Sequence, residues 1–178
     1  MVTVLTKTIG TGSSPTRDYS TIALFEADLA NIGTSSDLVT NDEQIVGEVY
    51  KDSDDSSLDV VGAVFNESLT TDSTRNVILT VAAADRHDGT RQSGIRATPA
   101  TSGHCFRISI NYMRVEFIEA VAGNATSNEC FRINPSKDGI VIDSCILESS
   151  ATTQTDQDGV YAGPGNTGTA SYPLTVSN

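Results

Sequence analysis

The chain has 178 residues, enough for one domain with a substantial buried core. Its 23 acidic residues outnumber the 11 basic ones, and the formal net charge of -12 would repel a phosphate backbone, so we expect no nucleic-acid partner. No apolar run approaches the roughly 20 residues that cross a bilayer, and we expect no membrane insertion.

The N-terminal residues MVTVLTKTIGTG lack the charged start, apolar middle and cleavage site of a signal peptide. We therefore expect a soluble chain that is made in a cytoplasm. The three cysteines, Cys105, Cys130 and Cys145, are too few and odd in number for a disulfide framework, so they should be reduced and pack as small hydrophobes.

The clearest helix signal lies at residues 20–33, STIALFEADLANIG. Ser20 can accept a hydrogen bond from a free amide of the first turn, and Gly33 can end the helix. One face of this helix should pack on a core, because its apolar residues recur at helical spacing. These residues are Ile22, Phe25, Leu29 and Ile32.

From about residue 44 the apolar residues recur with a period of two, in short segments bounded by Asp, Ser, Thr, Asn and Gly. Short strands at this density predict an all-β fold. The candidate strands are 44–50, 58–65, 76–82, 105–110, 112–118, 130–134, 139–147, 159–161 and 172–176.

These strands repeat along the chain. The run Cys-Phe-Arg-Ile occurs at 105–108 and again at 130–133, and residues 113–120 align with residues 140–147. An upstream copy of the second piece matches Val77, Leu79 and Val81 to Met113, Val115 and Phe117. The strands keep their register while the turns between them differ in length, which is typical of stacked coils.

Alternation along each repeated strand assigns its two faces. The Phe and Ile side chains of the Cys-Phe-Arg-Ile runs should point inward, and the Cys and Arg side chains outward. Stacked parallel strands lie about 4.8 Å apart, so equivalent residues should lie directly above one another. We expect Phe131 on Phe106, Ile133 on Ile108, and Ile140 and Ile142 on Met113 and Val115.

The helix at 20–32 and coil-like segments such as DGIVIDSCILES, 138–149, resemble the right-handed parallel β-helix, or pectate-lyase-like, superfamily. The resemblance implies an all-β right-handed parallel β-helix, or β-solenoid, with an N-terminal capping α-helix. Residues 1–42 would form the leading segment and capping helix, and residues 43–178 the coils. The superfamily includes polysaccharide lyases and hydrolases, adhesins and phage virion proteins, so it does not fix a function.

The repeated run could carry chemistry instead of packing. Cys105 and Cys130 on adjacent coils could form a disulfide or, with His104, part of a metal site, but a metal ion needs further ligands. A reactive thiol needs a base, and His104 should point to the opposite face of the strand from the cysteine beside it. A packed ladder of like residues is favoured.

Arg107 and Arg132 should stack like charges on an outer face, which requires interleaved carboxylates. Alternatively, this column docks an acidic neighbour or a sulfated or uronic polysaccharide. The available counter-ions are Glu116, Glu119, Glu129 and Asp143.

In the superfamily that the chain resembles, the lyases use calcium-binding acidic residues together with an arginine, and the hydrolases use clustered aspartates. Here no His follows Asp143 in IVIDSC, SGHC lacks the second Gly of a Gly-His-Gly motif, and no Asn-Thr-Asp run occurs. We therefore assign no catalytic residue, no metal and no cofactor, and favour a non-catalytic role over an enzymatic one.

Three polar loops are further candidates. The aspartates of KDSDDSSLD could ligate calcium, but a solvated turn is favoured there and at 155–159, TDQDG. The charged loop 85–91, DRHDGTR, could bind a ligand, although an ordinary polar bulge is favoured. The aspartates of the first loop are Asp52, Asp54, Asp55 and Asp59.

The last predicted coil has no cap in SYPLTVSN, so we expect a neighbouring subunit or further chain to cover it. The leading hypothesis is a structural component of a bacteriophage virion, either a head decoration protein or a tail spike or fibre module. It would be made in the host cytoplasm, exposed on the particle and bound to capsid or tail proteins, as a homo-oligomer such as a trimer. A host-surface polysaccharide is a further candidate partner. The alternatives are a polysaccharide-degrading β-helix enzyme, lyase or hydrolase, or a fragment of one, and a surface adhesin module.

Overall fold

The computed structural model describes residues 1–11, 16–51, 59–99, 103–122, 129–149, 159–163 and 175–177. Two helices and fourteen strands lie in these ranges, and a 3-10 turn spans Ala83–Asp85. The elements are β1 (Thr3–Ile9), α1 (Ile22–Ile32), α2 (Leu38–Asn41), β2 (Glu43–Val49), β3 (Asp59–Val61), β4 (Val64–Phe65), β5 (Val77–Val81), β6 (Arg96–Thr98), β7 (Phe106–Ile108), β8 (Arg114–Glu116), β9 (Glu119–Ala122), β10 (Phe131–Ile133), β11 (Val141–Asp143), β12 (Ile146–Ser149), β13 (Val160–Ala162) and β14 (Thr175–Ser177).

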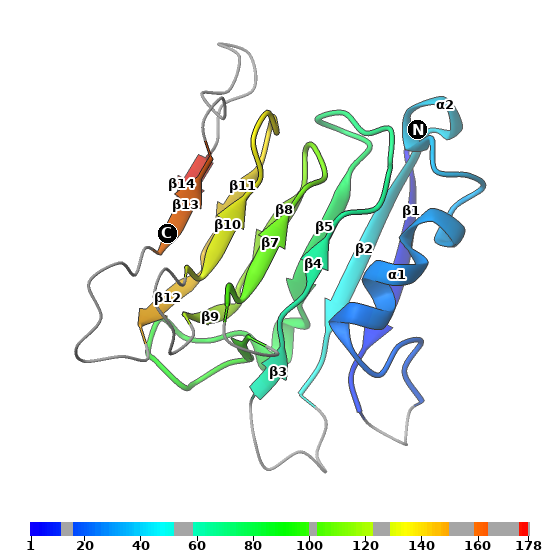
Figure 1. The fold of residues 1–178 in the computed structure, drawn as a ribbon. Helices are drawn as coiled ribbons and strands as arrows, with labels where there is room; N and C mark the ends of the chain where they lie inside the picture. Colours follow the sequence, from blue (N-terminus) through cyan, green and yellow to red (C-terminus); the bar gives the residue numbers. More distant parts are fainter. Residues whose placement is uncertain are drawn as a thin grey trace.

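The strands form three sheets, in which every described pair of neighbours is parallel. Sheet 1 has the order β1-β2-β5-β8-β11-β14, sheet 2 the order β3-β6-β9-β12, and sheet 3 the order β4-β7-β10-β13. From β2 onward the chain visits sheets 1, 2 and 3 in turn and then returns to sheet 1 (Figure 1). The chain is thus mostly β, with parallel sheets and few helices, as the all-β prediction requires.

The predicted register of the repeated run is confirmed. Phe131 pairs with Phe106 and Ile133 with Ile108 across the parallel strands β10 and β7. The two phenylalanine rings are stacked, with centroids 5.2 Å apart and an interplanar angle of 16°, and both are fully buried. In sheet 1 the predicted alignment also holds, because Val115 pairs with Leu79 on one side and with Ile142 on the other.

One prediction about side-chain direction is wrong. Cys105 and Cys130 are buried rather than outward-facing. The strands begin one residue later, at Phe106 and Phe131, so each cysteine lies in a corner where strand alternation does not apply. Phe117, which the sequence alignment matched to Val81, follows the end of β8 with a φ of 60° and is half-buried.

The corner between sheets 1 and 2 recurs with the same backbone conformation. Phe117 follows β8 and Ser144 follows β11, and both have left-handed φ values, 60° and 50°. Such values are uncommon outside glycine. Their recurrence shows that successive circuits turn this corner in the same way.

Helix α1 packs its buried residues Ile22, Phe25 and Leu29 at the β1 end of the molecule, where it contacts β1, β2, β3 and β4 (Figure 1). Its N-cap is Thr21, not the predicted Ser20: the Thr21 hydroxyl accepts from the Leu24 amide at 3.1 Å. The predicted helix is therefore confirmed, with a different cap. Strand β1 was not predicted, and it extends sheet 1 beside α1.

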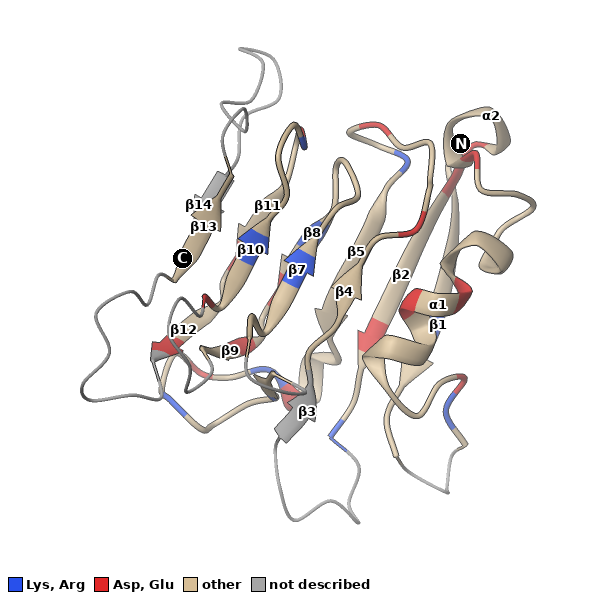
Figure 2. Cartoon of the chain, viewed as in Figure 1, with Lys and Arg blue, Asp and Glu red and all other residues tan. Residues whose placement is uncertain are grey.

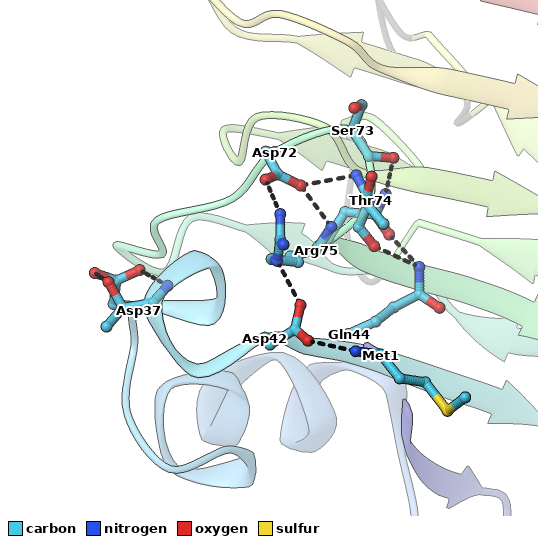
Figure 3. A network of polar contacts seen from close by, with 10 residues as sticks. Met1, Asp37, Asp42, Gln44, Asp72, Ser73, Thr74 and Arg75 are labelled. Carbon is cyan, nitrogen blue, oxygen red and sulfur yellow. Dashed lines mark hydrogen bonds and ion pairs between the residues drawn. The ribbon is translucent and has the colours of Figure 1, made fainter. Parts of the chain in front are cut away.

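A polar network fixes the leading ends of neighbouring strands of sheet 1 (Figure 3). Arg75, just before β5, donates from Nε to Asp42 at 2.8 Å and from Nη1 to Asp72 at 2.7 Å. Asp42 lies just before β2 and has a left-handed φ of 56°. These hydrogen bonds lower the pKa of Asp42 and raise that of Arg75, and they join β2 to β5 outside the ladder.

The loop between β5 and β6, residues 82–95, crosses the corners of other circuits, and we call it the strap. Asp85 accepts from the Lys51 amide at 2.9 Å, after β2. The Arg86 guanidinium lies 3.9 Å from the centroid of the Phe117 ring, after β8. His87 Nε2 lies 2.8 Å from the Ser144 carbonyl oxygen, after β11. The strap therefore ties together corners that are far apart in the sequence.

The stacked phenylalanines should dominate the stability of sheet 3. We expect Phe131→Ala to lower the free energy of unfolding by about 3–5 kcal/mol, because it removes a fully buried ring and leaves a cavity. Phe131→Leu should cost less. Urea unfolding followed by circular dichroism measures both losses.

Arg107→Ala is the matched control for the phenylalanine variants, since it changes the neighbour of Phe106 on the paired strand β7, whose side chain is exposed. This side chain donates an exposed hydrogen bond from Nε to Asn134, and such a bond is worth about 1 kcal/mol. If Phe131→Ala cost no more than this control, the stacked register would be wrong.

Candidate functional site

A column of side chains runs across the outer face of sheet 3. The register of β4, β7, β10 and β13 aligns Val64, Arg107, Arg132 and Tyr161. Figure 2 shows the two basic residues on β7 and β10. The predicted stacking of Arg107 on Arg132 is confirmed at the level of the backbone.

The two arginine side chains have different partners. Arg107 donates from Nε to the Asn134 side chain at 2.9 Å. Arg132 lies 3.8 Å from a Glu129 oxygen, and its guanidinium carbon is 5.0 Å from the centroid of the Tyr161 ring. Of the four predicted counter-ions, Glu129 thus takes this role for one arginine.

The other predicted counter-ions lie elsewhere. Glu116 pairs with Arg114 at 2.6 Å on sheet 1, where Asp143 lies beside it in register. Glu119 is fully buried on sheet 2 and lies 3.6 Å from Arg96. These three carboxylates lie on strands of sheets 1 and 2, whereas Arg107 and Arg132 lie on strands of sheet 3.

His104 and Glu129 form a contact beside the column. His104 Nδ1 faces the buried carboxylate of Glu129, and its Nε2 lies 3.5 Å from Arg132. Burial lowers the pKa of His104, and the Glu129 carboxylate partly opposes this effect. The imidazole is therefore engaged with charged neighbours rather than with a cysteine.

The cysteines have the environment of packed hydrophobes. Burial raises the pKa of Cys105, raises that of Cys130 to about 11 and raises that of Cys145 to about 12. The Cys130 thiol lies 3.1 Å from the Ala120 carbonyl oxygen, as a buried donor. A nucleophilic or metal-binding thiol requires a lowered pKa, so the geometry supports the favoured ladder interpretation.

Two hollows lie along this side of the molecule and share Asn66, and together we call them the furrow. The first has a volume of about 530 Å³ and the second about 420 Å³. The first is lined by Ala23, Glu26, Gly62, Ala63, Val64, Asn66, Gly103, His104, Cys105 and Arg107. The second is lined by Asn66, Glu67, Ser68, Leu69, Ser109, Ile110, Asn111, Asn134, Pro135 and Lys137.

Glu26 is the most unusual group of the furrow. It projects from α1 and is only 9% exposed. Its carboxylate accepts a hydrogen bond from the backbone amide of Asn66 at 2.9 Å. Burial raises its pKa, an effect that the hydrogen bond from Asn66 partly offsets. The first hollow therefore places a carboxyl group with a raised pKa alongside His104 and Arg107.

Sequence reasoning missed Glu26, although a signal for it existed. The apolar stripe of α1 runs through Ile22, Phe25 and Leu29, and position 26 completes the i, i+3, i+4, i+7 pattern. A carboxylate in that stripe breaks the helical pattern. Asn66 had no comparable signal, because it follows a two-residue strand in a polar stretch.

The predicted polar loops are placed only in part. The aspartates at 52, 54 and 55 and the segment 155–158 lie outside the described residues, and the side chain of Asp59 is not described. Loop 85–91 is more than a polar bulge, because Asp85, Arg86 and His87 make the contacts of the strap with other corners. Within the described ranges, no group of three or more His, Cys, Asp or Glu side chains is arranged to hold a metal ion.

Comparison of the chain with protein-family models, curated proteins and solved structures found no match. None of the helices in the described part of the chain has the length and apolar character needed to cross a membrane. We therefore infer function from the geometry of the sheets and of the furrow.

The ionised Glu26 side chain should cost stability at neutral pH. Because its pKa is raised in the folded chain, folding favours the protonated form, and stability falls as the pH rises from the unfolded pKa through the folded pKa. Glu26→Gln keeps an acceptor for the Asn66 amide and removes the charge. We expect its Tm to exceed the wild-type value by on the order of 1–2 °C at neutral pH.

This advantage should shrink when both proteins are melted near pH 4. Glu67→Gln, which removes a neighbouring charge from a more exposed position, should give a smaller rise. A Glu26→Gln protein that is less stable than wild type at neutral pH and equal to it in acid would contradict the sign of this effect.

The thiols should be unreactive while the chain is folded. At mildly alkaline pH we expect slow reaction of all three cysteines with a disulfide reagent such as DTNB, because the raised pKa values keep the thiolate fraction low. Denaturant should release three rapidly reacting thiols. Fast labelling of Cys105 or Cys130 without denaturant, located by peptide mass spectrometry, would refute the packed ladder.

Proposed function

We propose that the three sheets form a right-handed parallel β-helix, or β-solenoid, with α1 as its N-terminal cap. The cyclic order of the strands, the parallel in-register ladders and the recurring corners at Phe117 and Ser144 support this fold. The position of α1 against β1 to β4 supports its role as the cap.

We further propose that the chain is a structural component of a bacteriophage virion, either a head decoration protein or a tail spike or fibre module. The observation that carries this proposal is the regular addition of one strand to each of three sheets per circuit, which gives a stiff body. The strap adds ties across several circuits. A stiff body built by stacking suits an assembly component better than a protein that must close around a substrate.

The proposed partners are capsid or tail proteins and further copies of the chain, as in a trimer. The protein would be made in the host cytoplasm and exposed on the particle. An excess of acidic residues, with a net charge of -12, favours solubility on such a surface.

The furrow favours a second candidate, an enzyme acting on polysaccharide. Burial raises the pKa of Glu26, which is the direction that a general acid needs, and His104 and Arg107 line the same hollow. Glycoside hydrolysis usually needs two carboxyl groups about 5–10 Å apart across the scissile bond. Among the described side chains that line the first hollow, Glu26 is the single carboxylate, which makes the structural role the stronger proposal.

The virion proposal is tested on the particles themselves. Cells that carry the gene are induced to release particles, and these are banded in a density gradient and examined by mass spectrometry. We expect peptides of this chain in the particle band, and genes for head or tail proteins beside its own gene. Peptides confined to the soluble fraction, together with release of reducing or unsaturated sugars from polysaccharide by the purified chain, would favour the enzyme instead.

A further inference from the structure

We propose that the furrow binds a neutral, hydroxyl-rich oligosaccharide, with one sugar unit in the hollow at Glu26 and the following units in the hollow at Asn111 and Asn134. This inference adds a ligand and a site to the proposed structural role. It depends on the lining of the furrow and does not require that the chain belong to a particle.

The size of the furrow fits such a ligand. Volumes of about 530 and 420 Å³ lie within the range of about 300–1,000 Å³ typical of small-molecule sites. Asn66 lines both hollows, so they lie next to each other and successive units of a chain-like ligand can occupy both. A single small ion or metabolite would leave one of the two hollows unfilled.

The polar lining supplies the mixture of donors and acceptors that sugar hydroxyls require. A hydroxyl group both donates and accepts, and so do amide and hydroxyl side chains. The furrow carries three amides and two serines, and its first hollow adds an apolar wall against which the C–H face of a sugar ring can pack. The amides and serines are Asn66, Asn111, Asn134, Ser68 and Ser109, and the apolar wall is Ala23, Ala63 and Val64.

The charges of the furrow favour a neutral sugar over an acidic one. Its two permanent cations, Arg107 and Lys137, are matched by two carboxylates, Glu26 and Glu67. A polyanion such as a uronic or sulfated chain would meet these carboxylates along its path. The net charge of the whole chain, -12, adds to this repulsion.

Several of these groups are held in place before any ligand arrives. Asn134 accepts from Arg107 and donates to Ser109 at 2.5 Å, and the Asn111 side chain accepts from the Asp138 amide at 3.1 Å. Side chains that are already ordered lose little conformational entropy on binding. The furrow therefore presents a preformed array rather than a set of mobile surface groups.

The test is a titration of the isotopically labelled full chain with hexasaccharides, followed by NMR. The neutral probes are hexasaccharides of glucose and of N-acetylglucosamine, and the acidic probe is a galacturonate hexasaccharide. We expect at least one neutral probe to shift the signals of Asn66, Arg107 and Asn134, with an affinity that changes little when salt is raised.

Arg107→Ala should weaken this binding by about tenfold or more, roughly 1.4 kcal/mol. Arg114→Ala is the matched control, because it removes an arginine from the outer face of sheet 1, away from the furrow, and it should change affinity less than about twofold. Thermal melts of both variants verify that they fold. Asn66→Ala changes the residue that lines both hollows, and it should also weaken binding of the neutral probe.

Two results would overturn the proposal. One is that none of the neutral probes moves the furrow signals at concentrations up to about 10 mM, which is ten times a Kd of 1 mM at the weak end of specific binding. The other is that the acidic probe binds more tightly than the neutral ones and weakens steeply with salt, which would assign the furrow to a polyanion. Neither result bears on whether the chain is found in particles, so failure here is distinguishable from failure of the virion proposal.

Discussion

The structure depends on one constraint, the in-register stacking of equivalent residues in parallel strands. The rings of Phe106 and Phe131 lie face to face because β7 and β10 are aligned without offset. A slip of one residue would turn every inward side chain of a strand outward. The same constraint acts on all three sheets at once, because each circuit contributes to each sheet. Stacking therefore fixes the whole architecture from a small number of buried residues.

The corners are free of this constraint, and the chain uses them for its other features. Short corners keep a left-handed residue at Phe117 and at Ser144, whereas the corresponding connection after β5 is extended into the strap. His87 shows how specific the strap is. Its Nδ1 can accept from the Gly89 amide at 3.3 Å while Nε2 donates to the Ser144 carbonyl, an arrangement that requires the neutral ring with its hydrogen on Nε2. The additional residues of the longer connection thus make contacts with other circuits.

The sequence was informative where a residue repeats at a fixed offset. The two Cys-Phe-Arg-Ile runs predicted the parallel pairing of β7 with β10, since a repeated apolar pattern has to meet its own copy. The same reasoning misplaced Cys105, because alternation was extended one residue beyond the strand into a corner. Strand β1 was missed because its apolar residues, Val4, Leu5 and Ile9, do not recur with a period of two. The furrow could not be predicted at all, since it is assembled from α1, β4 and β7, and only the fold brings these together.

Glu26 connects the stability of α1 to the furrow. A leucine or methionine at this position of the apolar stripe would agree with the helical pattern and would avoid burying a carboxylate. The ionised side chain instead opposes folding at neutral pH, as its raised pKa indicates, while it lines the first hollow and holds the Asn66 amide. Residues that break a local rule at a cost in stability tend to mark functional positions. Helix α1 therefore lines the furrow with one part of its surface and packs on the core with another.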